Sequence, residues 1–177
     1  MGERDVSRDE AFTEDFRRIF AEEFDSLFRY LCRLTGDPAL AADTAQEAFV
    51  RLYQRGERPR ETRAWLATVS NNLVRDEHRR TTRRRNLHEA HPTMFVYGEP
   101  DPPPDEELVA QERRRRVRQA LDRLPERHRQ ALLLRQEGYS YREIATALDY
   151  RASGVGKLIV RATQAFRVAY EGAHASE

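Results

Sequence analysis

The sequence has a single cysteine, Cys32, among its 177 residues. One cysteine allows no internal disulfide and no zinc site built on paired cysteines. Because Cys32 lies within an apolar helical pattern, we interpret it as a small buried residue. The five histidines are scattered, and His88 and His91 lack carboxylate or thiol partners at ligand spacing. We therefore expect no metal site and no cofactor.

Long apolar runs are missing as well. No stretch approaches the roughly 20 apolar residues that a membrane-spanning helix needs. The N-terminal segment MGERDVSRDE is charged throughout and lacks the apolar centre of a signal peptide. We expect a cytoplasmic protein with no membrane partner. The sequence also shows no glycine-rich phosphate loop and no cluster of nucleophile and base, so an enzyme is not expected.

Lysine is nearly absent, since Lys157 is the only one of the 31 basic residues that is not an arginine. The net charge of +1 conceals separate blocks. Residues 1–57 hold 8 arginines against 13 acidic residues, whereas residues 60–95 hold 8 arginines against 4. Residues 96–112 hold 6 acidic residues and no basic one, and residues 113–167 hold 14 basic against 5 acidic residues. Two basic blocks predict two surfaces that bind a polyanion.

Apolar residues recur every three or four positions through the N-terminal half. Residues 12–34 predict one long amphipathic helix, or two in tandem, ending at Gly36. Asp37 and Pro38 are an N-cap followed by proline at the first helical position, which predicts a second helix. A third helix is expected over residues 62–80.

The polar side of this third helix combines amides with arginines. Exposed amides suit hydrogen bonding to nucleobases, and arginines bind phosphates. A solvated basic face with a frayed end is the alternative. The DNA-contact candidates here are Asn71, Asn72, Arg75, Asp76, Arg79, Arg80 and Arg83.

Helical periodicity disappears after residue 86, where EPDPPPDEE is acidic and proline-rich. This composition predicts a flexible, extended linker over residues 87–109. The apolar cluster at residues 94–97 interrupts it and predicts docking on a partner. Helix is expected to resume near Leu108.

The last third of the chain contains the signals of a helix-turn-helix. Ser140 and Glu143 form a capping box that opens a short helix. Asp149 and Tyr150 make a tight turn before a second amphipathic segment that carries cations. Such a second helix can lie in a DNA major groove. A plain helical hairpin whose cations face water is the alternative.

Three segments in this order resemble bacterial RNA polymerase sigma factors: LTGDPALAADTAQEAFVRLY, RAWLATVSNNLVRDEHRR and LPERHRQALLLRQEGYSYREIATAL. The short length, with no domain between the blocks, is similar to the extracytoplasmic-function group, group IV. The resemblance implies an all-α fold of two small helical domains joined by the acidic, proline-rich linker. Sigma domain 2 would span residues 10–86, and sigma domain 4, with the helix-turn-helix, residues 110–170.

The resemblance implies a function that spacing alone does not. Sigma factors bind core RNA polymerase, through its clamp helices and flap, direct it to promoter DNA and help to open the duplex. In this group the helix over residues 65–76 corresponds to the reader of the minus-ten element, which captures a flipped base; Asn72 and Asp76 are the positions expected to do so. The surface for the clamp helices corresponds to Asp43, Gln46, Glu47 and Arg51. By the same resemblance, Arg151, Lys157 and Arg161 are the residues expected to contact the minus-thirty-five element.

Many members of the group are held inactive by an anti-sigma protein between their two domains. The predicted linker would permit this, although no residue here identifies such a partner.

The predicted recognition helix departs from the family pattern. Asp149 stands where the family usually has glycine, and Arg151 replaces the usual serine N-cap. Gly154 and Gly156 are then expected inside the helix, each costing about 1 kcal/mol relative to alanine. One hypothesis is that this helix is partly disordered until DNA or another protein orders it. A weak recognition helix favours the alternative function of a sigma-like, non-initiating DNA-binding regulator or adaptor.

Overall fold

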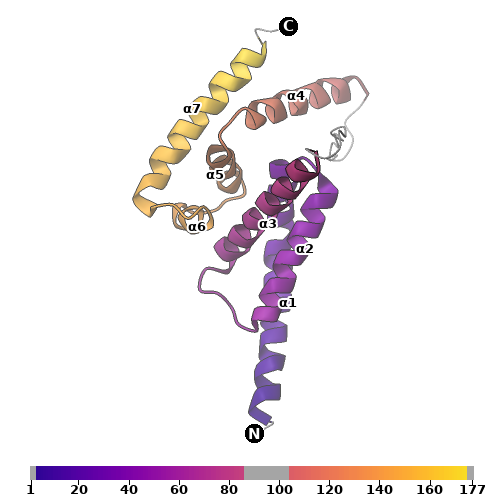
Figure 1. Ribbon diagram of the computed structural model, residues 1–177, viewed down its shortest axis with the longest axis vertical. Helices are drawn as coiled ribbons and strands as arrows, with labels where there is room; N and C mark the ends of the chain where they lie inside the picture. Colours follow the sequence, from indigo (N-terminus) through magenta and orange to yellow (C-terminus); the bar gives the residue numbers. More distant parts are fainter. Residues whose placement is uncertain (1–2, 86–103, 175–177) are drawn as a thin grey trace. The chain divides into compact units, whose positions relative to one another are not determined.

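The computed structural model describes residues 3–85 and 104–174 (Figure 1). All secondary structure in these ranges is helical, which confirms the predicted all-α class. The chain divides into two compact units, one before and one after residue 94. The apolar cluster at residues 94–97, the two histidines at 88 and 91 and most of the predicted linker lie outside the described residues.

Three helices form the N-terminal unit: α1 (Glu3–Thr35), α2 (Pro38–Arg55) and α3 (Thr62–Arg85). The first is one continuous helix of 33 residues rather than two in tandem. It ends at Gly36, whose φ of 70° is left-handed. The Asp37 side chain then accepts hydrogen bonds from the Ala39 and Leu40 amides, with Pro38 at the first helical position. The predicted cap is therefore confirmed.

The core of this unit lies where α1, α2 and α3 contact one another. Alanines at Ala41, Ala45 and Ala48 form the buried stripe of α2, and such small side chains allow close approach between helices. Full burial of each leucine or isoleucine contributes about 1.5–3 kcal/mol before conformational entropy is subtracted. The buried apolar residues are Ile19, Leu27, Tyr30, Leu31, Leu34, Ala41, Ala45, Ala48, Phe49, Leu52, Ala64, Leu66, Ala67 and Val74.

A row of phenylalanines continues the contact between α1 and α2 toward the N-terminus. Phenylalanines follow every fourth residue of α1 from Phe12 to Phe28. Two α2 rings interleave with this row: Phe49 lies 4.9 Å from Phe20, and Tyr53 lies 5.1 Å from Phe16, both edge to face. Aromatic pairs at such distances contribute about 0.5–1.5 kcal/mol beyond area burial. From Phe12 onward, the row therefore holds α1 against the end of α2.

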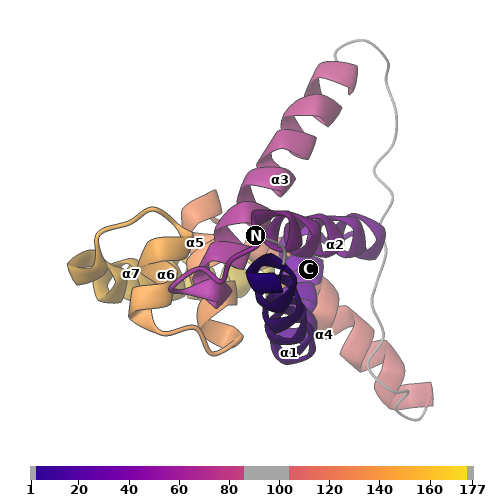
Figure 2. The same ribbon diagram turned by 90° about the horizontal axis from the view of Figure 1, so that it is seen from below.

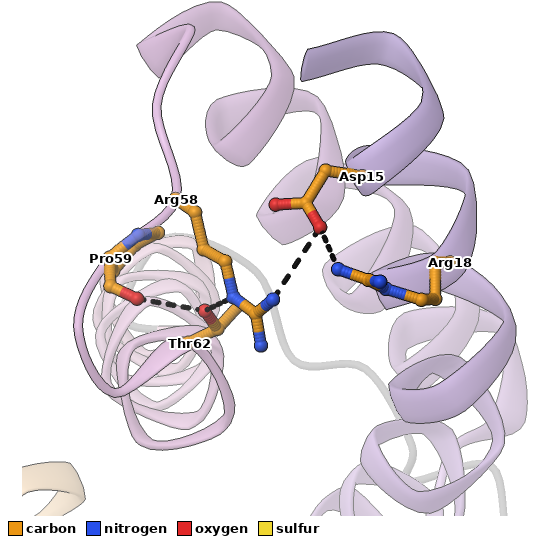
Figure 3. Close-up of polar contacts among 5 residues, drawn as sticks. All are labelled: Asp15, Arg18, Arg58, Pro59 and Thr62. Atoms are coloured by element: carbon orange, nitrogen blue, oxygen red, sulfur yellow. Dashed lines mark hydrogen bonds and ion pairs between the residues drawn. The ribbon is translucent and has the colours of Figure 1, made fainter. Parts of the chain in front are cut away.

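Polar contacts tie the loop between α2 and α3 to α1 (Figure 3). Asp15 of α1 forms ion pairs with Arg18 on its own helix and with Arg58 of the loop, the latter at 3.4 Å. The Arg58 side chain also donates to the Thr62 hydroxyl at 3.4 Å, and that hydroxyl donates to the Pro59 carbonyl at 2.9 Å. The first residue of α3 is thereby linked to α1.

Two further contacts orient α3 on α1. The Tyr30 hydroxyl donates to Oδ1 of Asn71 at 2.7 Å, and both side chains are buried. Nearer the start of α3, Arg63 pairs with Glu23 at 3.2 Å and donates to the Ser26 hydroxyl at 3.0 Å. These contacts specify which face of α3 is turned inward.

The C-terminal unit comprises α4 (Pro104–Asp122), α5 (Glu126–Gln136), α6 (Tyr141–Ala147), the short 3₁₀ turn η1 (Ala152–Gly154) and α7 (Val155–His174). Helix α4 begins earlier than the residue near Leu108 expected from the sequence. The long α7 packs against α4, α5 and α6. The buried apolar residues of this unit are Ala120, Leu121, Leu124, Ala131, Leu133, Leu134, Tyr139, Ile144, Ala145, Ala147, Leu148, Val155, Leu158 and Ala162.

Replacing Tyr30 with phenylalanine should lower the free energy of unfolding by about 1–2 kcal/mol, because it removes a buried hydrogen bond to the Asn71 amide. Urea denaturation followed by circular dichroism measures this. Tyr53→Phe is the matched control: the Tyr53 side chain is 52% exposed, so the change should stay within about 0.5 kcal/mol. Equal effects of the two substitutions would show that the buried bond contributes nothing.

Candidate nucleic-acid interface

The exposed face of α3 brings the predicted DNA-contact residues into one row. Asn72, Asp76, Arg79 and Arg83 are exposed and follow one another at intervals of three or four residues, and Arg75, exposed as well, lies one turn from both Asn72 and Arg79. Arg80, also exposed, lies beside this row. The C-terminal half of α3 projects beyond α1 and α2 (Figure 2), so the row lies on a part of the helix open to solvent.

Hydrogen bonds and ion pairs along this row are weak and exposed. Arg75 donates to Oδ1 of Asn72 at 3.3 Å, and Arg79 lies 3.8 Å from Asp76. Exposed pairs of this kind contribute about 0.2–1 kcal/mol. A nucleic-acid phosphate can therefore replace a carboxylate as the arginine's partner at little cost.

Asn71 is a correction to the sequence analysis. Its side chain is only 3% exposed and accepts the hydrogen bond from Tyr30, so it is not an exposed amide on the polar face. Ser70 is fully buried in the same way. Asn71 faces Tyr30 of α1, and the inward side of α3 includes the positions of both residues. Only Asn72 of the asparagine pair is available to a ligand.

The predicted polymerase-binding residues lie on the outer side of α2. Asp43, Gln46 and Arg51 are exposed, and Glu47 is half-buried. The Arg51 side chain donates to the Glu47 carboxylate at 2.8 Å, one helical turn away. Val50, 39% exposed, continues the line of Asp43, Gln46 and Glu47 at helical spacing. An apolar side chain thus interrupts an otherwise polar face.

Two helix endings of the same kind build the helix-turn-helix. Helix α5 ends at Gly138, whose amide donates to the Arg135 carbonyl at 3.0 Å while the Tyr139 amide donates to Leu134 at 3.1 Å. This pair of bonds is a Schellman motif, with a left-handed residue after the helix. The capping box of Ser140 and Glu143 then opens α6, as predicted.

Helix α6 ends in a second Schellman motif, but with an aspartate at the left-handed position. Asp149 has a φ of 46°, and its amide donates to the Thr146 carbonyl at 3.3 Å. The Tyr150 amide donates to Ala145 at 2.8 Å. The family's usual glycine at this position is therefore explained by the backbone, since glycine adopts positive φ without strain.

The predicted recognition helix is α7. Arg151, Lys157 and Arg161 are all exposed, and the last two lie one turn apart on the same face. The opposite side buries Val155, Leu158 and Ala162 against the rest of the unit, as listed for its core.

The predicted position of one glycine was wrong. Gly154 ends the 3₁₀ turn η1, and α7 begins only at Val155. Gly156 lies in the first helical turn. The helix therefore contains one glycine of this pair and not both, because the chain makes a 3₁₀ turn before it becomes α-helical.

Comparison with known proteins identifies both units. Residues 19–84 match the Sigma-70 region 2 family model, and residues 114–165 match Sigma-70, region 4. The ECF RNA polymerase sigma factor SigL of Mycobacterium tuberculosis is 35% identical over 158 residues, which are 86% of each chain. This chain belongs to the ECF sigma factors. SigE of Mycolicibacterium smegmatis is 30% identical over 177 residues, 98% of this sigma factor and 68% of that one.

Solved structures share the fold of this ECF sigma factor. The sigma factor RpoE from Bartonella quintana, solved in complex with the anti-sigma factor NepR, has a TM-score of 0.70 at 18% identity, covering 89% of this chain and 98% of that one. CnrH in complex with the cytosolic domain of CnrY has a TM-score of 0.66 at 20% identity, covering 94% of each chain.

Two titratable groups of this sigma factor have shifted pKa values. Desolvation by partial burial raises the pKa of the Cys32 thiol to about 11, so the thiol stays protonated at neutral pH. Hydrogen bonds from Arg115 and Arg116 lower the pKa of Glu112 to about 2. Across the described ranges, no three histidine, cysteine or acidic side chains gather as metal ligands would. Nor is any helix in those ranges long and apolar enough to span a bilayer.

Sequence reasoning missed two features of this sigma factor's surface. Val50 and Tyr53 are exposed apolar residues next to the predicted polymerase-binding positions. Their helical spacing from Asp43 was a usable signal, but apolar residues of an amphipathic helix are normally assigned to the core. Arg127 lies 5.5 Å from the centre of the Tyr150 ring, a contact between elements that no local pattern predicts.

Asp149→Gly should raise the free energy of unfolding by about 0.5–1 kcal/mol, because it removes the strain of a side chain at positive φ. Urea denaturation followed by circular dichroism measures the change. Gly138→Ala is the opposite variant: nothing lies within 4 Å of the added Cβ, so its loss of about 1 kcal/mol would come from backbone strain alone. A destabilised Asp149→Gly protein would contradict the assignment of strain to this turn.

Proposed function

We propose that this ECF sigma factor binds core RNA polymerase and directs it to specific promoters, opening the minus-ten element by capturing a flipped base. The observation that carries the proposal is the exposed row on α3, in which Asn72 and Asp76 lie among arginines. An amide and a carboxylate offer donors and acceptors to a base edge, and the guanidinium groups suit phosphates. Their combination on one solvent-facing row fits a strand whose bases have left the duplex.

The energy of opening constrains which contacts the row must make. Flipping one base costs a few kcal/mol. Hydrogen bonds between the flipped base and the Asn72 amide, and from the base to the Asp76 carboxylate, would offset that cost, together with phosphate contacts from Arg75, Arg79 and Arg80. The α3 scaffold suits this task because Tyr30 and Asn71 already hold its inner face. Little further ordering of the helix is then needed on binding.

The polymerase is proposed to bind on α2. Asp43, Gln46, Glu47 and Arg51 offer a polar pattern, and Val50 adds an apolar contact at its centre. Such an arrangement suits the side of another helix, where a buried apolar centre is surrounded by polar residues.

The second unit would complete promoter recognition. Arg151, Lys157 and Arg161 on and before α7 are proposed to contact the minus-thirty-five element in duplex form. We propose that this unit also contacts the polymerase flap. An anti-sigma factor is proposed as a further partner, on the strength of the structurally similar sigma factor RpoE, which was solved with one.

The alternative of a non-initiating, sigma-like regulator rested on a weak recognition helix. The position of Gly154 before α7 and the buried side of that helix weaken this argument. Run-off transcription with core polymerase separates the two functions. Promoter-specific RNA supports the sigma factor, and DNA binding without RNA supports the regulator.

Asn72→Ala should reduce promoter opening by about tenfold or more while leaving the affinity for core polymerase unchanged, because the lost contacts form only with the flipped base. Permanganate reactivity of unpaired thymines measures opening, and fluorescence anisotropy measures polymerase binding. The control is Gln54→Ala, an exposed amide at the end of α2 and outside the α3 row. Unchanged opening in Asn72→Ala would remove the base-capture role from this residue.

The double change Arg79→Gln and Arg80→Gln should lower the affinity for DNA of any sequence. It should also make the slope of log affinity against log salt concentration shallower, by about 0.7–0.9 for each phosphate contact that is lost. Titrations of the holoenzyme with promoter DNA at several salt concentrations give the slope. The matched control is the double change Arg17→Gln and Arg55→Gln. These arginines also lie at the surface, with side chains 73% and 43% exposed against 68% and 72% for Arg79 and Arg80, and they too pair with nearby carboxylates. A slope that falls equally in both double variants would show a general charge effect rather than contacts at α3.

A further inference from the structure

Gly154 lies in a crowded position, although it precedes a helix whose first residues face DNA in our proposal. It is buried, and a Cβ built on it would lie 2.8 Å from Cε1 of Tyr150. The same Cβ would lie 3.0 Å from Cγ and 3.1 Å from Nε of Arg151. Contacts below 3.0 Å require a neighbour to move, so any side chain at this position must displace Tyr150, and it also crowds Arg151.

Gly156, two residues later, has no such restriction. A Cβ there would meet only Cε2 of Tyr141, at the ordinary contact distance of 3.7 Å. The φ angles of both glycines lie outside the left-handed region, so neither is required by backbone conformation. The two glycines differ in the room available for a side chain. Position 154 has no room for a Cβ atom, whereas position 156 can accept one.

Tyr150 is restrained from several directions. Its amide donates to the Ala145 carbonyl in the Schellman motif of α6, and the Arg127 guanidinium of α5 lies 5.5 Å from its ring centre. The ring therefore connects α5, the turn and η1. The Arg151 side chain also lies next to Gly154, so a displaced Tyr150 ring would disturb it as well.

We propose that Gly154 is a positioning residue for DNA recognition: its missing side chain lets the Tyr150 ring and the Arg151 stem pack over η1, which holds the Arg151 guanidinium at the entrance to the recognition helix. The inference rests on the proposed function, because it assigns Arg151 a DNA contact. Its physical basis is that a long side chain binds more tightly when its stem is already confined, since less rotamer entropy is lost on binding. Tyr150 would supply that confinement.

The test measures the affinity of the holoenzyme for a duplex that the wild-type protein selects from a random-sequence library. Gly154→Ala should lower this affinity about tenfold, in the range of losing one good DNA contact. Gly156→Ala is the matched control and should leave it unchanged. The thermal midpoint of Gly154→Ala should stay within about 4 °C of the wild-type value, because the groups that it displaces are side chains rather than backbone.

A double-mutant cycle separates positioning from general damage. In an Arg151→Ala background, Gly154→Ala should cost no further affinity, because the residue it positions is gone. Adding Tyr150→Leu to Gly154→Ala should recover part of the loss, since leucine has no atom at the position of Cε1. Undiminished loss in the Arg151→Ala background would overturn the inference. The inference would also be overturned if Arg151→Ala alone lowered the affinity for DNA and Gly154→Ala did not.

The outcome for Arg151→Ala alone distinguishes the inference from the function on which it rests. Full affinity in that variant would refute the proposed DNA contact itself. Promoter-specific run-off RNA from the same protein would show that the sigma factor function stands even so.

Discussion

The packing of α3 against α1 is the interaction on which the exposed row of α3, our proposed promoter contact, depends. A helix turns about 100° per residue, so burying one set of positions determines which others face solvent. Leu66, Ser70, Asn71 and Val74 are buried, and the bond from Tyr30 to Asn71 holds that side inward. Asn72 and the arginines that follow are therefore turned outward. The exposed row of α3, which we propose to read bases, is thus a consequence of what the other side of the helix buries.

In the second unit, two turns determine which side of a helix is exposed. Gly138 and Asp149 both place a left-handed residue after a short helix, and the same pair of amide bonds ends each one. The two sharp endings, at Gly138 and Asp149, let α5, α6 and α7 pack on one another around a small apolar core. Because the outer side of α7 has no share in that core, its cations remain free of packing constraints. The crowding around Gly154 then concerns the one arginine that precedes the helix.

Ion pairs in this sigma factor are of two kinds, which differ in how far their side chains are exposed to solvent. Arg63 pairs with Glu23 where both side chains are only 23% exposed, and this contact fastens α3 to α1. Arg79 and Asp76 pair at 3.8 Å with 68% and 63% exposure, where water screens most of the attraction. Pairs of the first kind stabilise the fold. Pairs of the second kind contribute little to the fold and leave the arginines able to exchange partners.

Local sequence signals determined the helices, the Asp37 cap, the capping box at Ser140 and the family, because each depends on residues a few positions apart. Tertiary structure alone decided between two adjacent asparagines: Asn71 is buried because its partner, Tyr30, lies 41 residues away in the chain. It also decided the role of Gly154, whose reason is the space taken by the Tyr150 and Arg151 side chains. Sequence periodicity predicts that a helix has a buried and an exposed side. Which polar residue is buried at the boundary between the two sides depends on the side chains of other helices that pack there.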